Sequence, residues 1–165
     1  MDFESKLISL HTSTETVIQH HRDNISFLRQ SWLSHMNAIK ETGSRVIFAR
    51  DMSHIFTALE KEIWEVQSLN VFFKRNIINR PSTLEFEEVI FEKTGNTPPI
   101  VTSLSNYLQG LEEKISNAQA FMFPSMPPYE SKNVIVTRLI QDYFKVALEL
   151  HIYTISMICF VLVIL

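Results

Sequence analysis

The stretch LISLHTSTETVIQHHRDNISFLRQSWLSHMNAI, residues 7–39, decides the fold class of this chain. Mostly apolar side chains recur along it at gaps of three or four residues, which is the period of one face of an α-helix. The row consists of Leu7, Leu10, Thr14, Val17, His21, Ile25, Leu28, Trp32, His35 and Ile39. A stripe this narrow seals against another helix and does not enclose a pocket, so the stretch predicts helical assembly.

Polar residues interrupt this row at Thr14, His21 and His35, where a stable seam would carry Leu or Ile. Polar seam residues select the partner and the register at a cost in stability. The row therefore predicts a poor homodimer and association with a different chain. We expect His21 to lie in the interface and His20 to face solvent.

The same period continues through most of the chain and predicts about five helices. The first helix ends at Gly43. The second helix runs from Phe48 to Ile77 and ends before Pro81. The third helix starts at Ser82-Thr83-Leu84-Glu85, which has the spacing of a capping box, and ends at Gly95. A fourth follows Pro98-Pro99, and a fifth starts near Ser131. The fold class is thus all-α, with extended coiled-coil segments that assemble with partner helices. The expected regions are a helical coiled-coil region over 1–122, a proline-rich linker over 123–130, and a C-terminal helix with an apolar tail over 131–165.

Composition excludes several classes of function. The chain has 15 basic and 18 acidic residues that are well interleaved, which argues against a nucleic-acid-binding stripe. Its six histidines include no pair at the i, i+4 spacing of a helical metal site, and its three glycines form no phosphate-binding loop. No nucleophile elbow or acid/base pair is recognisable, and Glu60-Lys61-Glu62 and Glu112-Glu113-Lys114 are interpreted as solvated helix faces. We expect no enzyme activity, no cofactor and no metal.

The candidate functional residues are therefore those of a partner interface. Large rings are the usual anchors of such interfaces, and a two-helix hairpin cannot bury all those of the first two helices. The candidates share seam positions of the first, second and fourth helices: Leu28, Trp32, Met52, Ile55, Leu59, Ile63, Val66, Phe73, Leu104, Leu108, Leu111 and Ile115.

The carboxyl-terminal segment Leu150–Leu165 contains no Asp, Glu, Lys or Arg. As a helix it would reach about 24 Å, which is short of the roughly 30 Å hydrocarbon core of a bilayer. A membrane anchor and a buried last helix both fit this segment.

Short motifs from residue 44 onward occur in a familiar order. They are Ser44-Arg45, Phe48, Asp51, Ile55, Ala58-Leu59, Arg75-Asn76, Thr97-Pro98-Pro99, Asn106-Tyr107-Leu108, Leu111-Glu112, Ile115, Leu139, Tyr143-Phe144, Val146-Ala147-Leu148 and Leu150. In this order the chain resembles the coiled-coil region of the fifty-eight-kilodalton class of nucleoporin, over roughly Ile18 to Leu150. It has no Phe-Gly dipeptide, which members of that family carry as repeats.

The resemblance implies a structural role, in which helices dock into a coiled coil with other channel nucleoporins at the nuclear pore. Two alternatives remain open on the sequence. One is a tail-anchored adaptor on the cytosolic face of the endoplasmic reticulum or the outer mitochondrial membrane, inserted through Leu150–Leu165. The other is a subunit of a spindle or kinetochore rod.

Overall fold

The computed structural model describes residues 2–39, 46–144 and 162–163. Over these ranges the chain is helical and has no strand, which confirms the all-α class. The elements are α1 (Phe3–Ile39), α2 (Val46–Phe73), a π-helical turn η2 (Lys74–Ile78), α3 (Pro81–Thr94), α4 (Pro99–Met122) and α5 (Asn133–Tyr143). The predicted stop at Gly43 and most of the apolar tail, Leu150–Leu165, lie outside the described residues.

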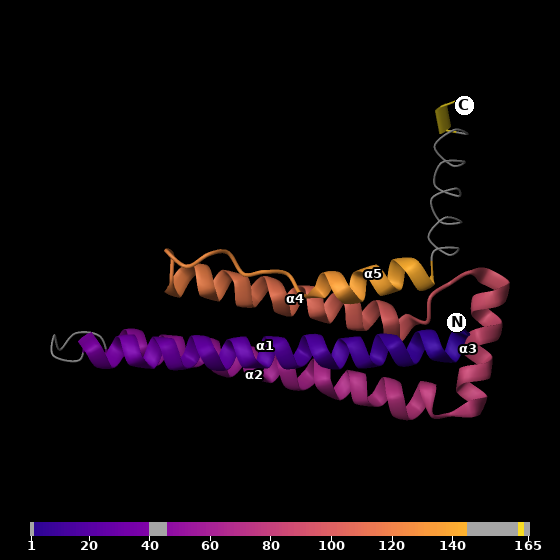
Figure 1. Cartoon of the computed structure of the whole chain (residues 1–165), viewed down its shortest axis with the longest axis horizontal. Coiled ribbons are helices and arrows are strands. Elements are labelled where there is room, and N and C mark those ends of the chain that lie inside the picture. Colours follow the sequence, from indigo (N-terminus) through magenta and orange to yellow (C-terminus); the bar gives the residue numbers. More distant parts are fainter. Residues whose placement is uncertain (1, 40–45, 145–161, 164–165) are drawn as a thin grey trace.

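The long helices form an elongated bundle (Figure 1). Helices α1 and α2 run antiparallel, α4 packs on both of them, and α5 packs on α1 and α4. The short helix α3 crosses the end of the bundle at which the chain begins. There Phe91 of α3 packs on Phe3 and Phe144, with ring centroids 5.6 and 5.2 Å away.

The apolar row of α1 is the centre of this bundle. From Leu7 to Trp32 every member of the row is buried, including the polar residues Thr14 and His21. The next member of the row, His35, is exposed, and the side chain of Ile39 lies outside the described part of the chain. The stripe of α1 therefore seals against helices of the same chain.

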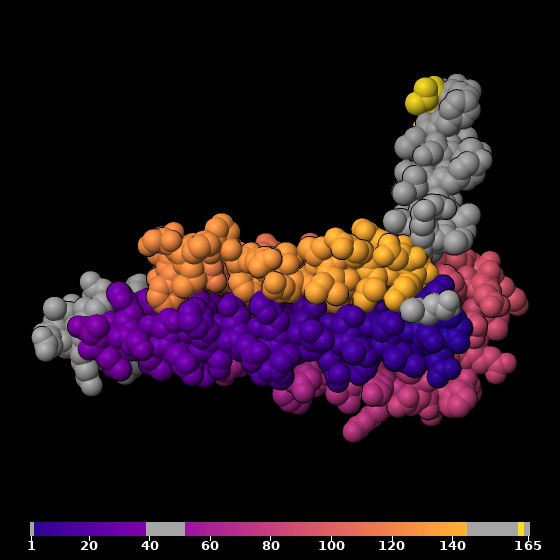
Figure 2. Space-filling view, in the orientation of Figure 1, coloured from indigo at the N-terminus to yellow at the C-terminus, as the bar shows by residue number. Residues whose placement is uncertain are grey.

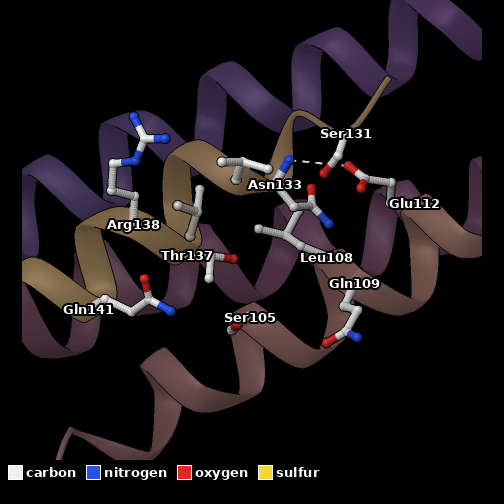
Figure 3. Close-up of a pocket in the computed structure, with 11 residues that line it drawn as sticks. Ser105, Leu108, Gln109, Glu112, Ser131, Asn133, Thr137, Arg138 and Gln141 are labelled. Carbon is white, nitrogen blue, oxygen red and sulfur yellow. Dashed lines mark hydrogen bonds between the residues drawn. The ribbon is translucent and has the colours of Figure 1, made fainter. Parts of the chain in front are cut away.

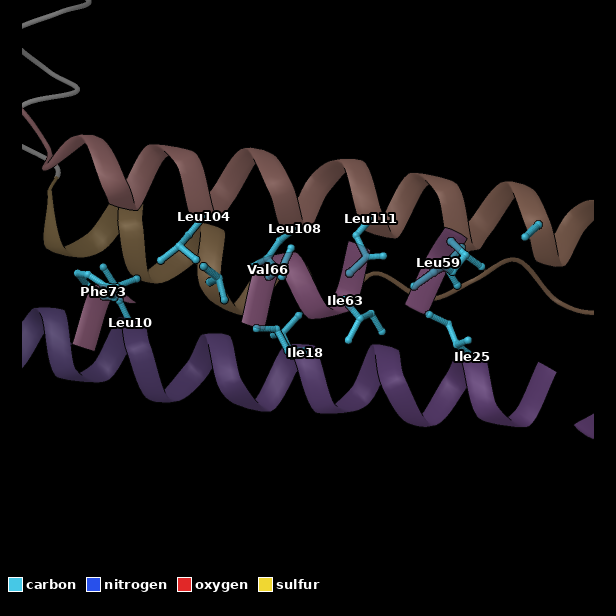
Figure 4. Packing of buried hydrophobic residues seen from close by; sticks show 14 of the residues in the cluster. Leu10, Ile18, Ile25, Leu59, Ile63, Val66, Phe73, Leu104, Leu108 and Leu111 are labelled. Atoms are coloured by element: carbon cyan, nitrogen blue, oxygen red, sulfur yellow. The ribbon is translucent and has the colours of Figure 1, made fainter. Parts of the chain in front are cut away.

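Helices α2 and α4 contribute the rest of the core. Figure 4 shows Leu104, Leu108 and Leu111 of α4 pointing toward α1, with side chains of α2 such as Ile63 and Val66 among them. All five are at most 4% exposed. Burial of this kind contributes roughly 1.5–3 kcal/mol for each large aliphatic side chain.

Proline and glycine set several helix boundaries. Gly95 adopts a left-handed conformation with φ 71° and ends α3, as its position predicts, because a residue without Cβ tolerates this conformation. Pro99 starts α4, also as predicted. The predicted capping box at Ser82 is wrong, because α3 already starts at Pro81, which fits the first helical position. Arg80 is the N-cap residue, and its side chain makes no capping hydrogen bond.

The proline-rich segment between α4 and α5 packs against the bundle, and we call residues 123–132 the strap. On the face drawn in Figure 2, the orange atoms of the strap and α5 lie directly on α1. Phe123 meets Trp32 edge to face with ring centroids 6.2 Å apart, and Gln119 Nε2 donates to the carbonyl oxygen of Pro127 at 2.7 Å. The strap thus holds a fixed path along α1 and α4.

Among the described residues, no helix is long and apolar enough to cross a membrane.

Candidate functional site

A buried polar site surrounds His21 of α1. Its side chain has no solvent exposure, and both ring nitrogens have partners. The Tyr129 hydroxyl lies 2.7 Å from Nδ1, and Asn133 Oδ1 lies 3.0 Å from Nε2. Because an amide oxygen only accepts, Nε2 carries the proton and donates to Asn133, and Nδ1 accepts from the Tyr129 hydroxyl.

Glu112 of α4 joins this site to the start of α5. Its Oε2 accepts hydrogen bonds from the backbone N–H groups of Lys132 and Asn133, each at 3.1 Å. Figure 3 shows the one from Asn133. The N-terminus of α5 has no cap from the residue at its own start, so this carboxylate satisfies N–H groups that would otherwise lack a partner. The same oxygen lies 3.8 Å from His21 Nε2. We call His21, Tyr129, Asn133 and Glu112 the His21 clasp.

Burial sets the protonation of the clasp. Desolvation lowers the pKa of His21, while the hydrogen bond to Asn133 and the charge of Glu112 oppose this shift. Desolvation also raises the pKa of Tyr129 well above its ordinary value of 10.0, and the charge of Glu112 adds to this shift. At neutral pH the ring is therefore uncharged and the Tyr129 hydroxyl keeps its proton, so that this hydroxyl can donate to Nδ1.

A groove of about 460 Å³ lies next to the clasp, between α4 and α5 (Figure 3). Leu108, Val134 and Val136 contribute apolar side chains, and the remaining lining consists of hydroxyl and amide side chains, Glu112 and the cation Arg138. The lining includes Glu112 and Asn133, but both already bond within the clasp. With both nitrogens of His21 engaged, the clasp has no free imidazole base. The geometry of the clasp supports a structural role, in which its hydrogen bonds hold α1, α4, the strap and α5 together.

The residues predicted for a partner interface occupy the core of the single chain. Ile55 is half-buried and packs against the core, and the other eleven are buried: Leu28, Trp32, Met52, Leu59, Ile63, Val66, Phe73, Leu104, Leu108, Leu111 and Ile115. The structure thus brings them together within one chain. Contact with a second chain at these positions stays a prediction, and it would require the bundle to open.

Sequence reasoning placed His21 in a seam, where the structure has it, and missed its partners. It interpreted Glu112 as part of a solvated face, but the side chain is only 17% exposed and caps α5. Helical period could not reveal this role, because the two N–H groups that it binds lie 20 and 21 residues further along. The only hint in the sequence was that the polar residues Tyr129 and Asn133 lie just before and just after residue 130, where the predicted linker ends.

Comparison with protein families, curated proteins and solved structures finds no match to this chain. Among the described residues, no group of three or more His, Cys, Asp or Glu side chains could hold a metal ion.

Proposed function

We propose that this chain is a structural helical subunit, without enzyme activity, that docks onto other helical proteins through an outer surface of its bundle. The supporting observation is an apolar surface on α2, which we call the α2 outer face and define as Trp64, Val71 and Phe72. Trp64 is 68% exposed and Phe72 51% exposed, although α2 packs against both α1 and α4. Trp and Phe are typical anchors of protein interfaces.

The geometry beside Trp64 suits a helical partner. Positions 64, 71 and 72 lie on one side of a helix because they are seven and eight residues apart. A cavity of about 270 Å³ next to Trp64 lies between α1 and α2. Ile25, Ile63 and Trp64 form its apolar part, and its polar part consists of Arg22, Ser26, Glu60 and Gln67. An amphipathic helix recognises such a groove by placing apolar side chains on it at helical spacing.

The partners that we propose are the coiled-coil nucleoporins of the central transport channel, at the nuclear envelope. This proposal rests on the order of the sequence motifs. Docking through outer faces fits the geometry better than a shared seam, since the seam residues are already buried within the chain.

A tail-anchored membrane adaptor is the second candidate, and it rests on the uncharged segment Leu150–Leu165. The two candidates differ in what removal of this segment does. A tagged chain that ends at Leu150 should remain at the nuclear rim if the chain is a pore component. It should become diffuse if the segment is a membrane anchor.

Affinity purification of the full chain from cells, followed by identification of the co-purifying chains, tests the proposal. We expect coiled-coil nucleoporins to co-purify with the wild-type chain. The double variant Trp64→Glu/Phe72→Glu should lose them, because it places charges on a surface that docking desolvates. Circular dichroism should show unchanged helix content, since both positions are exposed.

Glu113→Lys is the matched control, because Glu113 is an exposed residue of a different helix, α4. It should leave co-purification unchanged. Retention of the partners by the double variant would contradict docking through α2. Co-purification of membrane-insertion factors or of spindle proteins in place of nucleoporins would contradict the proposed partners.

A further inference from the structure

A long groove follows the contact between α1 and α2. The cavity beside Trp64 is one half of it, and a second hollow of about 590 Å³ is the other half. Arg22 and Gln67 line both halves, whereas none of the described residues of α4 or α5 lines either. The halves together extend over residues 15–26 of α1 and 60–71 of α2, which is about 16 Å or three helical turns. We call this surface the α1/α2 groove, and it is long enough to hold a segment of helix.

The two edges of the α1/α2 groove differ in chemistry. On the α2 edge, Trp64 and Val71 of the α2 outer face lie seven residues apart, and both are exposed. On the α1 edge, the exposed carboxylates of Glu15 and Asp23 lie eight residues apart. Each spacing corresponds to about two turns of helix. Glu60 also lines the groove, but it is already paired with an arginine of α1 at 2.6 Å.

The carboxylates of the α1 edge have no Lys or Arg partner in the described ranges of the chain. Asp23 accepts a hydrogen bond from Nε2 of Gln19 at 2.8 Å, and Glu15 lies 3.5 Å from the ring of His11. Arg22 lies between the two carboxylates in the sequence, but its guanidinium group donates to the side-chain oxygens of two glutamines. One of these bonds crosses the groove to α2. The two negative charges are therefore open to a cationic ligand.

We propose that the α1/α2 groove binds a helix of the partner protein that carries Lys or Arg side chains, about two turns apart, along one edge of its apolar stripe. The cations pair with Glu15 and Asp23, and the apolar stripe covers Trp64 and Val71. Helix α4 covers a different side of the α1–α2 pair, so the partner helix packs without displacing it. This inference rests on the proposed function, because it takes the docking partner to be helical.

Two synthetic peptides test this partner chemistry on the purified full chain. Each has about 21 residues, no tryptophan, and leucine at every third or fourth position. The first peptide carries lysines along one edge of its leucine stripe, and the second carries glutamates at the same positions. We expect the lysine peptide to bind at least about fivefold more tightly, and the difference to shrink at high salt.

The fluorescence of Trp64 reports where the lysine peptide lies. The ring of Trp64 is exposed in the free chain, and a helix in the groove would withdraw it from water. We expect the tryptophan emission to shift to shorter wavelength on binding. The shift should be absent in Trp64→Phe, because the remaining tryptophan, Trp32, is already buried.

The double variant Glu15→Lys/Asp23→Lys reverses the charge of the α1 edge. It should prefer the glutamate peptide, again by at least about fivefold. Glu92→Lys/Glu113→Lys is the matched control, because it makes the same change of charge at exposed positions of α3 and α4. It should keep the preference of the wild-type chain for the lysine peptide. Circular dichroism should show unchanged helix content in both, since all four positions are exposed.

The inference is overturned if neither peptide binds, if the wild-type chain binds both equally, or if Glu15→Lys/Asp23→Lys keeps the wild-type preference. A lysine peptide that binds without shifting the emission of Trp64 also overturns it, because the peptide then lies elsewhere. Affinity purification without nucleoporins would overturn the proposed partners and leave the peptide result unchanged. Equal binding of the two peptides would overturn the charge pairing and leave the effect of Trp64→Glu/Phe72→Glu on co-purification unchanged.

Discussion

Tyr129 supplies a hydrogen bond that the buried ring of His21 obtains from no other described residue. Its replacement by phenylalanine leaves Nδ1 unpaired at a site without solvent exposure. We expect Tyr129→Phe to lower the free energy of unfolding by about 1–3 kcal/mol, as measured by urea denaturation. Tyr107→Phe, at a half-exposed tyrosine of α4, should change it by less than about 0.5 kcal/mol. An equal effect of the two substitutions would contradict the clasp.

Asn70 of α2 presents the opposite case, a buried polar group that is only half satisfied. It is 1% exposed, its Nδ2 donates to the His11 carbonyl oxygen at 3.2 Å, and its Oδ1 has no donor among the described residues. Because a buried unpaired oxygen is costly, Asn70→Leu should raise the free energy of unfolding by about 1 kcal/mol. Asn117→Leu, at an exposed position of α4, is the control and should have little effect. A clear loss of stability in Asn70→Leu would contradict this prediction.

The N-terminus of α5 is capped by a residue of another helix, Glu112 of α4. Glu112→Ala removes the acceptor of two N–H groups, and loss of a helix cap costs about 0.5–2 kcal/mol. Glu113→Ala removes an adjacent, exposed carboxylate with the same charge. We expect faster hydrogen exchange in residues 133–143 for Glu112→Ala alone. Similar exchange in the two variants would show that Glu112 does not cap α5.

Helix boundaries could be predicted where a single residue dictates the backbone. Gly95 and Pro99 fix the end of α3 and the start of α4 through their own conformational preferences. The π-helical turn at Lys74–Ile78 carries no such local signal, and the apolar spacing predicted one continuous helix through Ile77. The cap of α5 was equally hidden, because Glu112 acts across the whole strap.

For the molecule as a whole, the sequence predicts which side of each helix is buried but not what covers it. A helical period places Leu28, Leu59 and Leu111 in seams, and all three are buried. The helical period does not indicate whether the facing helix belongs to the same chain or to another one. The partners of His21 lie 108 and 112 residues away from it, a separation that no local pattern encodes.

Leu59 distinguishes a seam that is closed within the chain from one that needs a partner. In the single chain it is 3% exposed, so Leu59→Asp places an unpaired carboxylate in the core. We expect it to lower the free energy of unfolding of the isolated chain by at least about 3 kcal/mol. Glu113→Lys should have little effect. A variant Leu59→Asp that folds as stably as the wild type would place Leu59 outside the core of the isolated chain.

The central claim is that α2 and α4 pack against each other within one chain, and the ion pair between Lys114 and Glu62 allows a direct measurement of it. Isotopically light and heavy chains are unfolded together, refolded and treated with a carbodiimide, which joins an amine to a carboxylate only when the two are in contact. Mass spectrometry then measures the masses of the cross-linked peptides that contain Glu62 and Lys114. We expect only cross-linked peptides whose two halves are both light or both heavy. Peptides that join a light half to a heavy half would contradict the central claim, because the seam would then be shared between chains.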